Sequence, residues 1–276
     1  MITIKSKREI DIMREAGRIN YLAHMAVKDA IRPGISTLEL DKIAEKVIRD
    51  HGGTPSFKGY EGYPGSICAS INEVVIHGIP NKNIILKNGD IISIDLGTCY
   101  KGYHADSAMT HPVGDVNEIK MKLIKVTEES FFEGLKYALP HNHLSDISHA
   151  IETYVRSFGF DVVKEFTGHG VGMELHEDPP IPNYGPSGFG PILKPGMVLA
   201  IEPMVAINSA RVKILSDGWT TVIKDKSASA HYENTIVITE EGCEILTLDN
   251  KEDVNVKEWC YRIKRYSKRI ITKCTI

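Results

Sequence analysis

Residues 88–111 read NGDIISIDLGTCYKGYHADSAMTH, and the rest of the chain is organised around them. The pattern predicts two strands, 90–99 and 102–110, joined by a tight turn. Each strand carries one aspartate, Asp95 or Asp106, within an apolar run. An ionised carboxylate in such a run is costly to desolvate, which favours a metal ion or another cation beside it. The alternative is that one aspartate faces solvent and the other caps a turn.

The same pattern occurs twice in the chain, which strengthens the metal hypothesis. Residues 86–95 align with residues 193–202, and residues 104–110 align with residues 231–237. The segment between the acids is longer in the second copy, as expected for an insertion in a hairpin loop. Two related hairpins would bring four carboxylates to a common centre, the aligned acids being Asp95 with Glu202 and Asp106 with Glu233.

Composition limits the classes of protein to consider. The chain has 276 residues, is 42% hydrophobic and 25% charged, and can bury one large core or at most two domains. A net charge of −3 gives no reason to expect nucleic acid or an acidic membrane as partner. Five cysteines without C-x-x-C spacing indicate neither a disulfide framework nor a zinc ribbon, and they fit a reducing cytoplasm. We expect a cytoplasmic protein, because no signal peptide or membrane-spanning apolar run is visible.

Helical periodicity appears in two pairs, one before each hairpin. Residues 6–30 and 36–51 form the first pair, the second helix opening with a Ser36–Glu39 capping box. Residues 116–139 and 145–158 form the second pair. Each half of the chain is therefore a helix pair followed by a hairpin.

The loops carry aromatic and histidine side chains that suit a pocket. Phe57, Tyr60 and Tyr63 lie among glycines and prolines, where they either line a site or cover the sheet. His77 stands at a strand end, where a histidine is structural or faces a site. His169 lies in the glycine-rich run TGHGVG, whose glycines let backbone and substrate approach closely.

The four acids and one histidine make an oxygen-rich candidate site. Four carboxylates suit two adjacent divalent ions better than one catalytic zinc. Oxygen ligands with one nitrogen favour Mn, Fe or Co, with Zn as a further option. Such a site activates water and polarises a carbonyl, so the sequence predicts a dinuclear metal-dependent hydrolase. The predicted ligands are Asp95, Asp106, His169, Glu202 and Glu233.

At these residues the chain resembles the type I methionine aminopeptidases of the short bacterial kind, over about residues 4–248. The motifs that carry the resemblance are GYEGYPGS (59–66), SINEVVIHGIP (70–80), DLG (95–97) with Asp106, TGHGVG (167–172), IEP (201–203) and ENT (233–235). The resemblance implies the α/β pita-bread fold, a pseudo-twofold repeat with a curved antiparallel sheet and outer helices. It also implies that the five predicted ligands bind the two metal ions.

The resemblance further implies roles at the substrate. His77 and His176 would flank the scissile peptide, and Glu202 would handle protons at the metal-bound water. Phe57 and Leu175 depart from the bacterial pattern, which has a small residue, often Cys, at the first position and an aromatic at the second. The methionine side chain would lie among Phe57, Tyr60, Tyr63, Cys68, Leu175 and Trp219.

The implied reaction is removal of the initiator methionine from nascent proteins whose second residue is small, by attack of a metal-bridging hydroxide on the first peptide bond. We expect a monomer with one catalytic domain, residues 1–248, followed by a basic tail, residues 249–276. We interpret the tail as solvated or partly helical. The more specific alternative is that it contacts RNA, such as that of the ribosome.

Three other interpretations fit less well. Prolidase-like and X-Pro aminopeptidases use similar ligands but carry a large extra N-terminal domain. Type II methionine aminopeptidases carry a helical insertion, for which the segment between His176 and Glu233 leaves no room. A pita-bread protein that serves as a metal-free binding module would have lost ligands, and all five are present here.

Overall fold

The computed structural model describes residues 1–248, so the predicted tail at 249–276 lies outside the described residues. Within the described part, no helix is both long and apolar enough to span a membrane. The helical elements are α1 (Lys7–Ala30), α2 (Thr37–Asp50), the 3-10 turn η1 (Tyr60–Gly62), α3 (Glu118–Leu135) and α4 (Leu144–Ser157).

Local sequence signals explain where these helices begin and end. Ser6 caps α1 and Ser36 caps α2, each in a capping box with the glutamate three residues later. Helix α3 ends at Leu135, before the predicted position 139, and tight turns follow it. The proline at 140 explains only why the helix does not reach the predicted position, because proline disfavours helical backbone in the residue before it.

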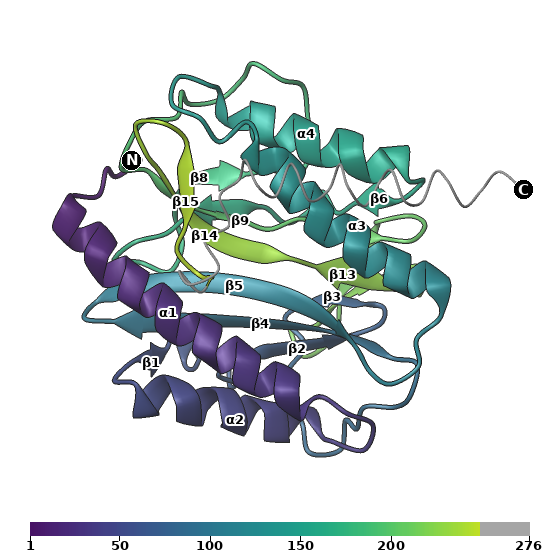
Figure 1. Cartoon of the computed structure of the whole chain (residues 1–276). Helices are drawn as coiled ribbons and strands as arrows, with labels where there is room; N and C mark the ends of the chain where they lie inside the picture. The colour runs from purple at the N-terminus through teal and green to yellow at the C-terminus, as the bar shows by residue number, and fades with distance from the viewer. Residues whose placement is uncertain (249–276) are drawn as a thin grey trace, which may run out of the picture.

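One curved, mainly antiparallel sheet forms the centre of the molecule, in the order β1-β4-β5-β14-β9-β7-β8 (Figure 1). Strand β2 (Cys68–Ile71) pairs with β4 and β15 (Cys243–Ile245) pairs with β14. The strands along the main path are β1 (Thr54–Pro55), β4 (Ile91–Tyr100), β5 (Tyr103–Pro112), β14 (Glu233–Ile238), β9 (Val198–Ile201), β7 (Gly168–Gly170) and β8 (Glu177–Ile181).

Two smaller three-stranded sheets flank the central one. The first has the order β13-β10-β6, formed by β13 (Ser229–His231), β10 (Met204–Ala206) and β6 (Asp161–Val162). The second has the order β11-β12-β3, formed by β11 (Val212–Ile214), β12 (Thr221–Ile223) and β3 (Val74–Ile76).

The two halves of the chain repeat the same arrangement about the β5–β14 junction. Helices α1 and α2 precede the β4–β5 hairpin, and α3 and α4 precede the β9–β14 pair. Strands β5 and β14 pair with each other, so the hairpins meet at the middle of the sheet. The predicted α/β class, the repeat and the curved antiparallel sheet are confirmed.

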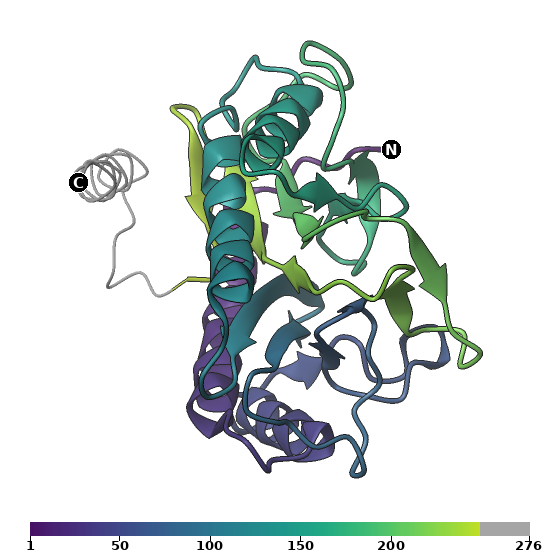
Figure 2. The ribbon, with the colours of Figure 1, turned by 90° about the vertical axis from the view of Figure 1, so that its right-hand side faces the viewer.

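The sheet separates a helical layer from the side on which the smaller strands gather. Alternate residues of β4, among them Ile92, Ile94 and Leu96, pack into a buried cluster with Ile19 and Ala23 of α1. The residues between them face the other way, because side chains alternate along a strand. In Figure 2, α1 and α3 run along one side and the β11–β12 hairpin lies on the opposite side.

Candidate active site

The register of three strands places three carboxylates on one face of the sheet. Asp95 on β4 lies opposite Ala108 on β5, and Glu233 on β14 lies opposite the same Ala108. Asp106 pairs with Gly97, which is two residues from Asp95. Directly paired residues share a face and residues two apart share a face, so these acids point to the side away from α1.

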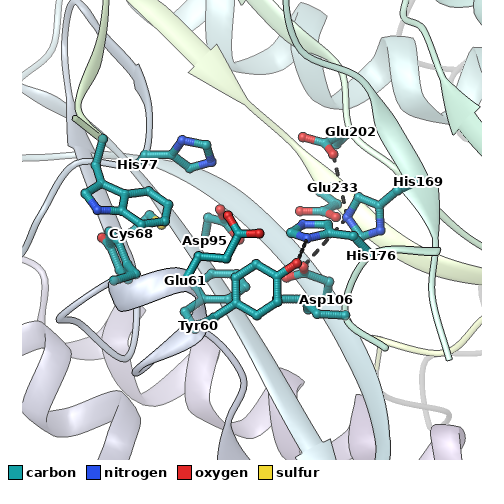
Figure 3. A pocket seen from close by; sticks show the side chains of 14 residues that line it. Tyr60, Glu61, Cys68, His77, Asp95, Asp106, His169, His176, Glu202 and Glu233 are labelled. Atoms are coloured by element: carbon teal, nitrogen blue, oxygen red, sulfur yellow. Dashed lines mark hydrogen bonds and ion pairs between the residues drawn. The ribbon is translucent and has the colours of Figure 1, made fainter. Parts of the chain in front are cut away.

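Glu202 and His169 complete the group from the second half. Glu202 follows the last residue of β9, and His169 lies at the middle of β7, opposite Ala200 of β9. The Nε2 atom of His169 lies 3.9 Å from Asp106 Oδ2 and 3.8 Å from Glu202 Oε1 (Figure 3). The Nδ1 atom of His169 is 2.9 Å from the carbonyl oxygen of Gly170. Because a carbonyl accepts, Nδ1 carries the proton and the Nε2 lone pair faces the carboxylates.

Burial gives the four carboxylates unusual electrostatics. Burial is the largest cause that raises the pKa of Asp95, Asp106, Glu202 and Glu233, and repulsion from neighbouring acids adds to it for Asp95, Glu202 and Glu233. Burial also lowers the pKa of His169 to about 3, so that ring is neutral at pH 7. The ionised carboxylates are unfavourable in this site by themselves, and a bound cation would stabilise them.

These residues fit divalent metal ions. Asp95 Oδ1, Asp106 Oδ1 and Glu233 Oε1 are buried without a hydrogen-bond partner in the described part of the chain. Ligand atoms of Asp106, His169 and Glu233 all lie within 4.8 Å of one another. Unpaired buried oxygens beside an imidazole lone pair are the donors that Mn, Fe or Co accept.

A cavity of about 230 Å³ opens beside the carboxylates. It is smaller than the roughly 300–1,000 Å³ of sites for drug-sized ligands, which suits a single amino-acid side chain with its peptide bond. All thirteen predicted site residues line it, namely Phe57, Tyr60, Tyr63, Cys68, His77, Asp95, Asp106, His169, Leu175, His176, Glu202, Trp219 and Glu233.

The side of the cavity away from the acids is apolar. Phe57, Tyr63, Cys68 and Leu175 form one buried cluster, with Trp219 packed against it. The rings of Tyr63 and Trp219 meet edge to face with centroids 5.1 Å apart. The two residues that depart from the bacterial pattern, Phe57 and Leu175, are therefore both part of this apolar wall.

His77 and His176 line the same cavity as the carboxylates, with His77 beside Trp219 and His176 beside His169. His176 Nδ1 is 2.8 Å from the hydroxyl of Tyr60, and its ring lies 4.4 Å from that of His169. Burial lowers the pKa of His77 to about 4, with a smaller contribution from His176. Burial lowers the pKa of His176 as well. Both rings are thus neutral at pH 7, and each offers one N–H donor to a ligand.

Sequence reasoning missed two residues at this site. Glu61 lines the cavity from η1, where it has a positive φ of 48° and lies between Tyr60 and Gly62. His231 is 2% exposed, and its Nε2 lies 3.4 Å from Glu202 Oε2. The signal for His231 was its position two residues before Glu233, since residues two apart in extended backbone share a face.

Comparisons with known proteins identify the family and the fold. The profile of metallopeptidase family M24 matches residues 11–240. Methionine aminopeptidase 1 of Bacillus subtilis (strain 168) is 58% identical over 247 residues, which cover 90% of this chain and 99% of that protein. The crystal structure of methionine aminopeptidase from Thermotoga maritima superposes with a TM-score of 0.89 at 44% identity, covering 90% of this chain and 100% of that one. Prolidase from Pyrococcus furiosus superposes with a TM-score of 0.74 at 27% identity, covering 89% of this chain and 65% of that one.

Proposed function

The chain belongs to metallopeptidase family M24 and, within it, to the methionine aminopeptidases, and from this premise we propose how it removes N-terminal methionine. The reaction uses two divalent ions, Mn, Fe or Co with Zn as a further option. They are held by Asp95, Asp106, His169, Glu202 and Glu233, and the substrates are nascent chains whose second residue is small.

The observation that carries the proposal is the orientation of His169. Its Nε2 lone pair faces Asp106 Oδ2 and Glu202 Oε1 at 3.9 Å and 3.8 Å. When these carboxyl groups are ionised, three acceptors face one another at these distances, an arrangement that a cation between them stabilises. When bound, the two ions would supply a hydroxide nucleophile at neutral pH and a Lewis acid for the scissile carbonyl.

The remaining side chains orient the substrate and move protons. The apolar wall of Phe57, Tyr63 and Leu175 receives the methionine side chain and excludes water from it. Neutral His176, which is held by the Tyr60 hydroxyl, donates an N–H to the scissile carbonyl oxygen, and neutral His77 contacts the scissile nitrogen. Glu202, buried with a raised pKa, takes the proton from the attacking water and passes it to the leaving amine.

The cellular setting follows from this reaction. Nascent polypeptides carry initiator methionine, so we place the enzyme in the cytoplasm, as a monomer that meets chains leaving the ribosome. Contact with the ribosome through residues 249–276 is part of the proposal.

Methionine release from Met-Ala-Ser and Met-Leu-Ser by metal-stripped protein tests the proposal, with Mn²⁺ or Co²⁺ then added back. We expect metal-dependent release from Met-Ala-Ser and at least about 100-fold slower release from Met-Leu-Ser, because a narrow site rejects the larger side chain by steric clash. Equal rates for both peptides would contradict the small-residue rule. Activity without metal would contradict the dinuclear centre.

An X-Pro peptide serves as the control for the prolidase alternative. The chain shares its fold with the Pyrococcus furiosus prolidase, but the two sequences are only 27% identical, whereas identity with the Bacillus subtilis methionine aminopeptidase is 58%. We therefore expect slow cleavage of Ala-Pro beside Met-Ala-Ser. Preferential cleavage of Ala-Pro would move the chain to the prolidase branch of the family.

A further inference from the structure

His231 is a buried histidine that lies between two of the proposed metal ligands. Its Nε2 atom is 3.4 Å from Glu202 Oε2 and 3.9 Å from Glu233 Oε2. The side chain is 2% exposed, and Nε2 has no hydrogen-bond partner in the described part of the chain. A buried polar atom without a partner is rare in proteins and calls for a functional explanation.

The side chain of Thr110 on β5 holds both the N–H and the carbonyl group of the His231 backbone. The hydroxyl of Thr110 donates to the carbonyl oxygen of His231 at 2.8 Å and accepts from its N–H at 2.9 Å. The same hydroxyl lies 2.8 Å from Ser93 Oγ, which must donate because the Thr110 proton is already used. The backbone that carries the imidazole ring is thereby anchored to the β4–β5 hairpin that also carries Asp95 and Asp106.

The surroundings of Nε2 decide which tautomer fits. Two carboxyl groups approach this atom, and in the ionised form in which carboxylates bind metal their oxygens only accept hydrogen bonds. A lone pair at Nε2 would face acceptors, whereas an N–H at Nε2 can donate to them. His231 therefore needs the tautomer opposite to that of His169, whose proton is on Nδ1.

Glu202 consequently has a different neighbour at each carboxylate oxygen. Oε1 faces the lone pair of His169, and Oε2 faces the N–H of His231. We propose that His231 is a positioning residue that donates Nε2–H to Glu202 Oε2 and holds this carboxylate with Oε1 directed at the metal centre. This inference rests on the proposed dinuclear site.

The distance between His231 Nε2 and Glu202 Oε2 is longer than that of a normal hydrogen bond, and a small movement of either side chain would form the bond. Donor–acceptor distances of about 2.7–3.2 Å are normal for N–H···O, against 3.4 Å here. Hydrogen bonds in catalytic sites often tighten when ligands bind. The energy gain comes from preorganisation, because a held carboxylate loses less rotational freedom on metal binding.

The experiment titrates full-length, metal-stripped protein with Mn²⁺ by calorimetry. The variants are His231→Leu, which removes the donor, and His231→Gln, whose amide keeps one. His111→Leu is the matched control, because His111 is also a buried histidine with an unpartnered Nε2 in the described part of the chain, but it lies on β5 and not on β13. We expect His231→Leu to weaken Mn²⁺ binding by about 10-fold to 100-fold, as for other residues that orient metal ligands. His231→Gln should recover most of the loss, and His111→Leu should bind as the wild type does.

The possible outcomes separate this inference from the proposed function. Absence of Mn²⁺ binding by the wild type would overturn the metal centre itself. Binding by the wild type and His231→Leu with equal affinity would overturn the positioning role alone. Equal weakness of His231→Leu and His231→Gln would also overturn it, because the ring would then act as a direct metal ligand.

A measurement on the unaltered protein covers the case in which His231→Leu does not fold. Two-dimensional ¹⁵N–¹H spectra of histidine side chains distinguish the two neutral tautomers, and His231→Gln assigns the signal. We expect His231 protonated at Nε2 and His169 protonated at Nδ1. A His231 signal protonated at Nδ1 would overturn the inference.

Discussion

At the scale of a residue, Glu233 shows how a metal ligand lowers the stability of the metal-free fold. Its carboxylate is buried beside Asp106, Glu202 and Asp95, and burial followed by these like charges raises its pKa. The Oε1 atom has no hydrogen-bond partner in the described part of the chain. Without a cation, this arrangement costs folding free energy, and the cost is the source of the site's affinity for metal.

We predict that Glu233→Gln stabilises the metal-free protein while it destroys the enzyme. Removal of one acid relieves desolvation and repulsion, so the free energy of unfolding should rise by about 1 kcal/mol. Methionine release should fall by more than about 100-fold, because a ligand is lost. Urea denaturation and a Met-Ala-Ser assay measure the two effects. Glu241→Gln, at an exposed turn, is the control and should change neither the free energy of unfolding nor methionine release. A loss of stability in Glu233→Gln would contradict the claim that burial of this acid destabilises the metal-free fold.

A second residue-scale prediction concerns pH. Burial lowers the pKa of His24 from 6.5 to about 4, while its Nε2 donates to the carbonyl of Ser107. The folded state thus holds His24 neutral, so its full contribution to stability is present above about pH 6.5 and is lost as pH falls toward 4. Between pH 7 and pH 5 this one group should cost the folded state about 2 kcal/mol.

His24→Gln tests this, because glutamine also donates to Ser107 but does not titrate. The metal-free variant should lose about 2 kcal/mol less than the wild type between pH 7 and pH 5 in urea denaturation. His149→Gln, at an exposed position, should follow the wild type. Parallel curves for His24→Gln and the wild type would show that protonation of His24 is not linked to unfolding.

At the scale of elements, α1 is held to the sheet by backbone contacts as well as by apolar packing. Asn20 donates to the carbonyls of Leu96 at 2.6 Å and Ala105 at 3.3 Å, which lie on β4 and β5. Gly17, one turn earlier, lies against the backbone of Leu246. Helix α1 therefore fixes the hairpin that carries Asp95 and Asp106, so its position matters to the site.

We predict that Gly17→Ala destabilises the protein although alanine favours helices. An added Cβ would lie 2.0 Å from the carbonyl oxygen of Leu246, and backbone cannot move aside as a side chain can. The free energy of unfolding should fall by about 2 kcal/mol or more. Gly134→Ala in α3 is the matched control, since its Cβ meets side-chain atoms of Ile147 and Ile151 at 2.9–3.2 Å.

The control should change stability by less than about 1 kcal/mol, because the gain in helix propensity offsets a small shift of the isoleucines. Thermal unfolding of both variants measures the difference. An equal effect of the two substitutions would refute the claim that α1 is limited by backbone contact with Leu246.

At the scale of the whole molecule, two similar halves supply one site at their junction. Asp95 and Asp106 come from the first half, and His169, Glu202 and Glu233 come from the second. The β5–β14 pairing joins the halves next to the carboxylates. Metal binding is thus expected to cross-link the halves and to stabilise both together.

We predict that a chain ending at residue 248 keeps peptide hydrolysis. The described fold already contains all thirteen predicted site residues and its own cores. Turnover of Met-Ala-Ser and the thermal midpoint should match those of the full chain, while sedimentation with ribosomes should weaken. The full chain is the control, and loss of peptide turnover on truncation would show that residues 249–276 belong to the catalytic fold.

The sequence by itself determined the strands of the two related hairpins, the helix pairs and the identity of the candidate ligands. Helix ends at Ser6 and Ser36 depend on bonds within a few residues, and strands follow from alternation over neighbours, so local sequence encodes them. The repeated acids made Asp95 and Glu202 recognisable as equivalent, and the motifs around them identified the family. Comparison with known proteins confirmed that identification and the fold.

Tertiary structure alone decided how these side chains face one another. The tautomer of His169 depends on where the Gly170 carbonyl points, and the role of His231 depends on its approach to Glu202 from another strand. The resemblance had already placed Phe57 and Leu175 in one pocket, and the structure adds that they pack in one buried cluster with Tyr63 and Cys68. Such contacts form only after the sheet curves and its halves meet, so no pattern of neighbouring residues specifies them.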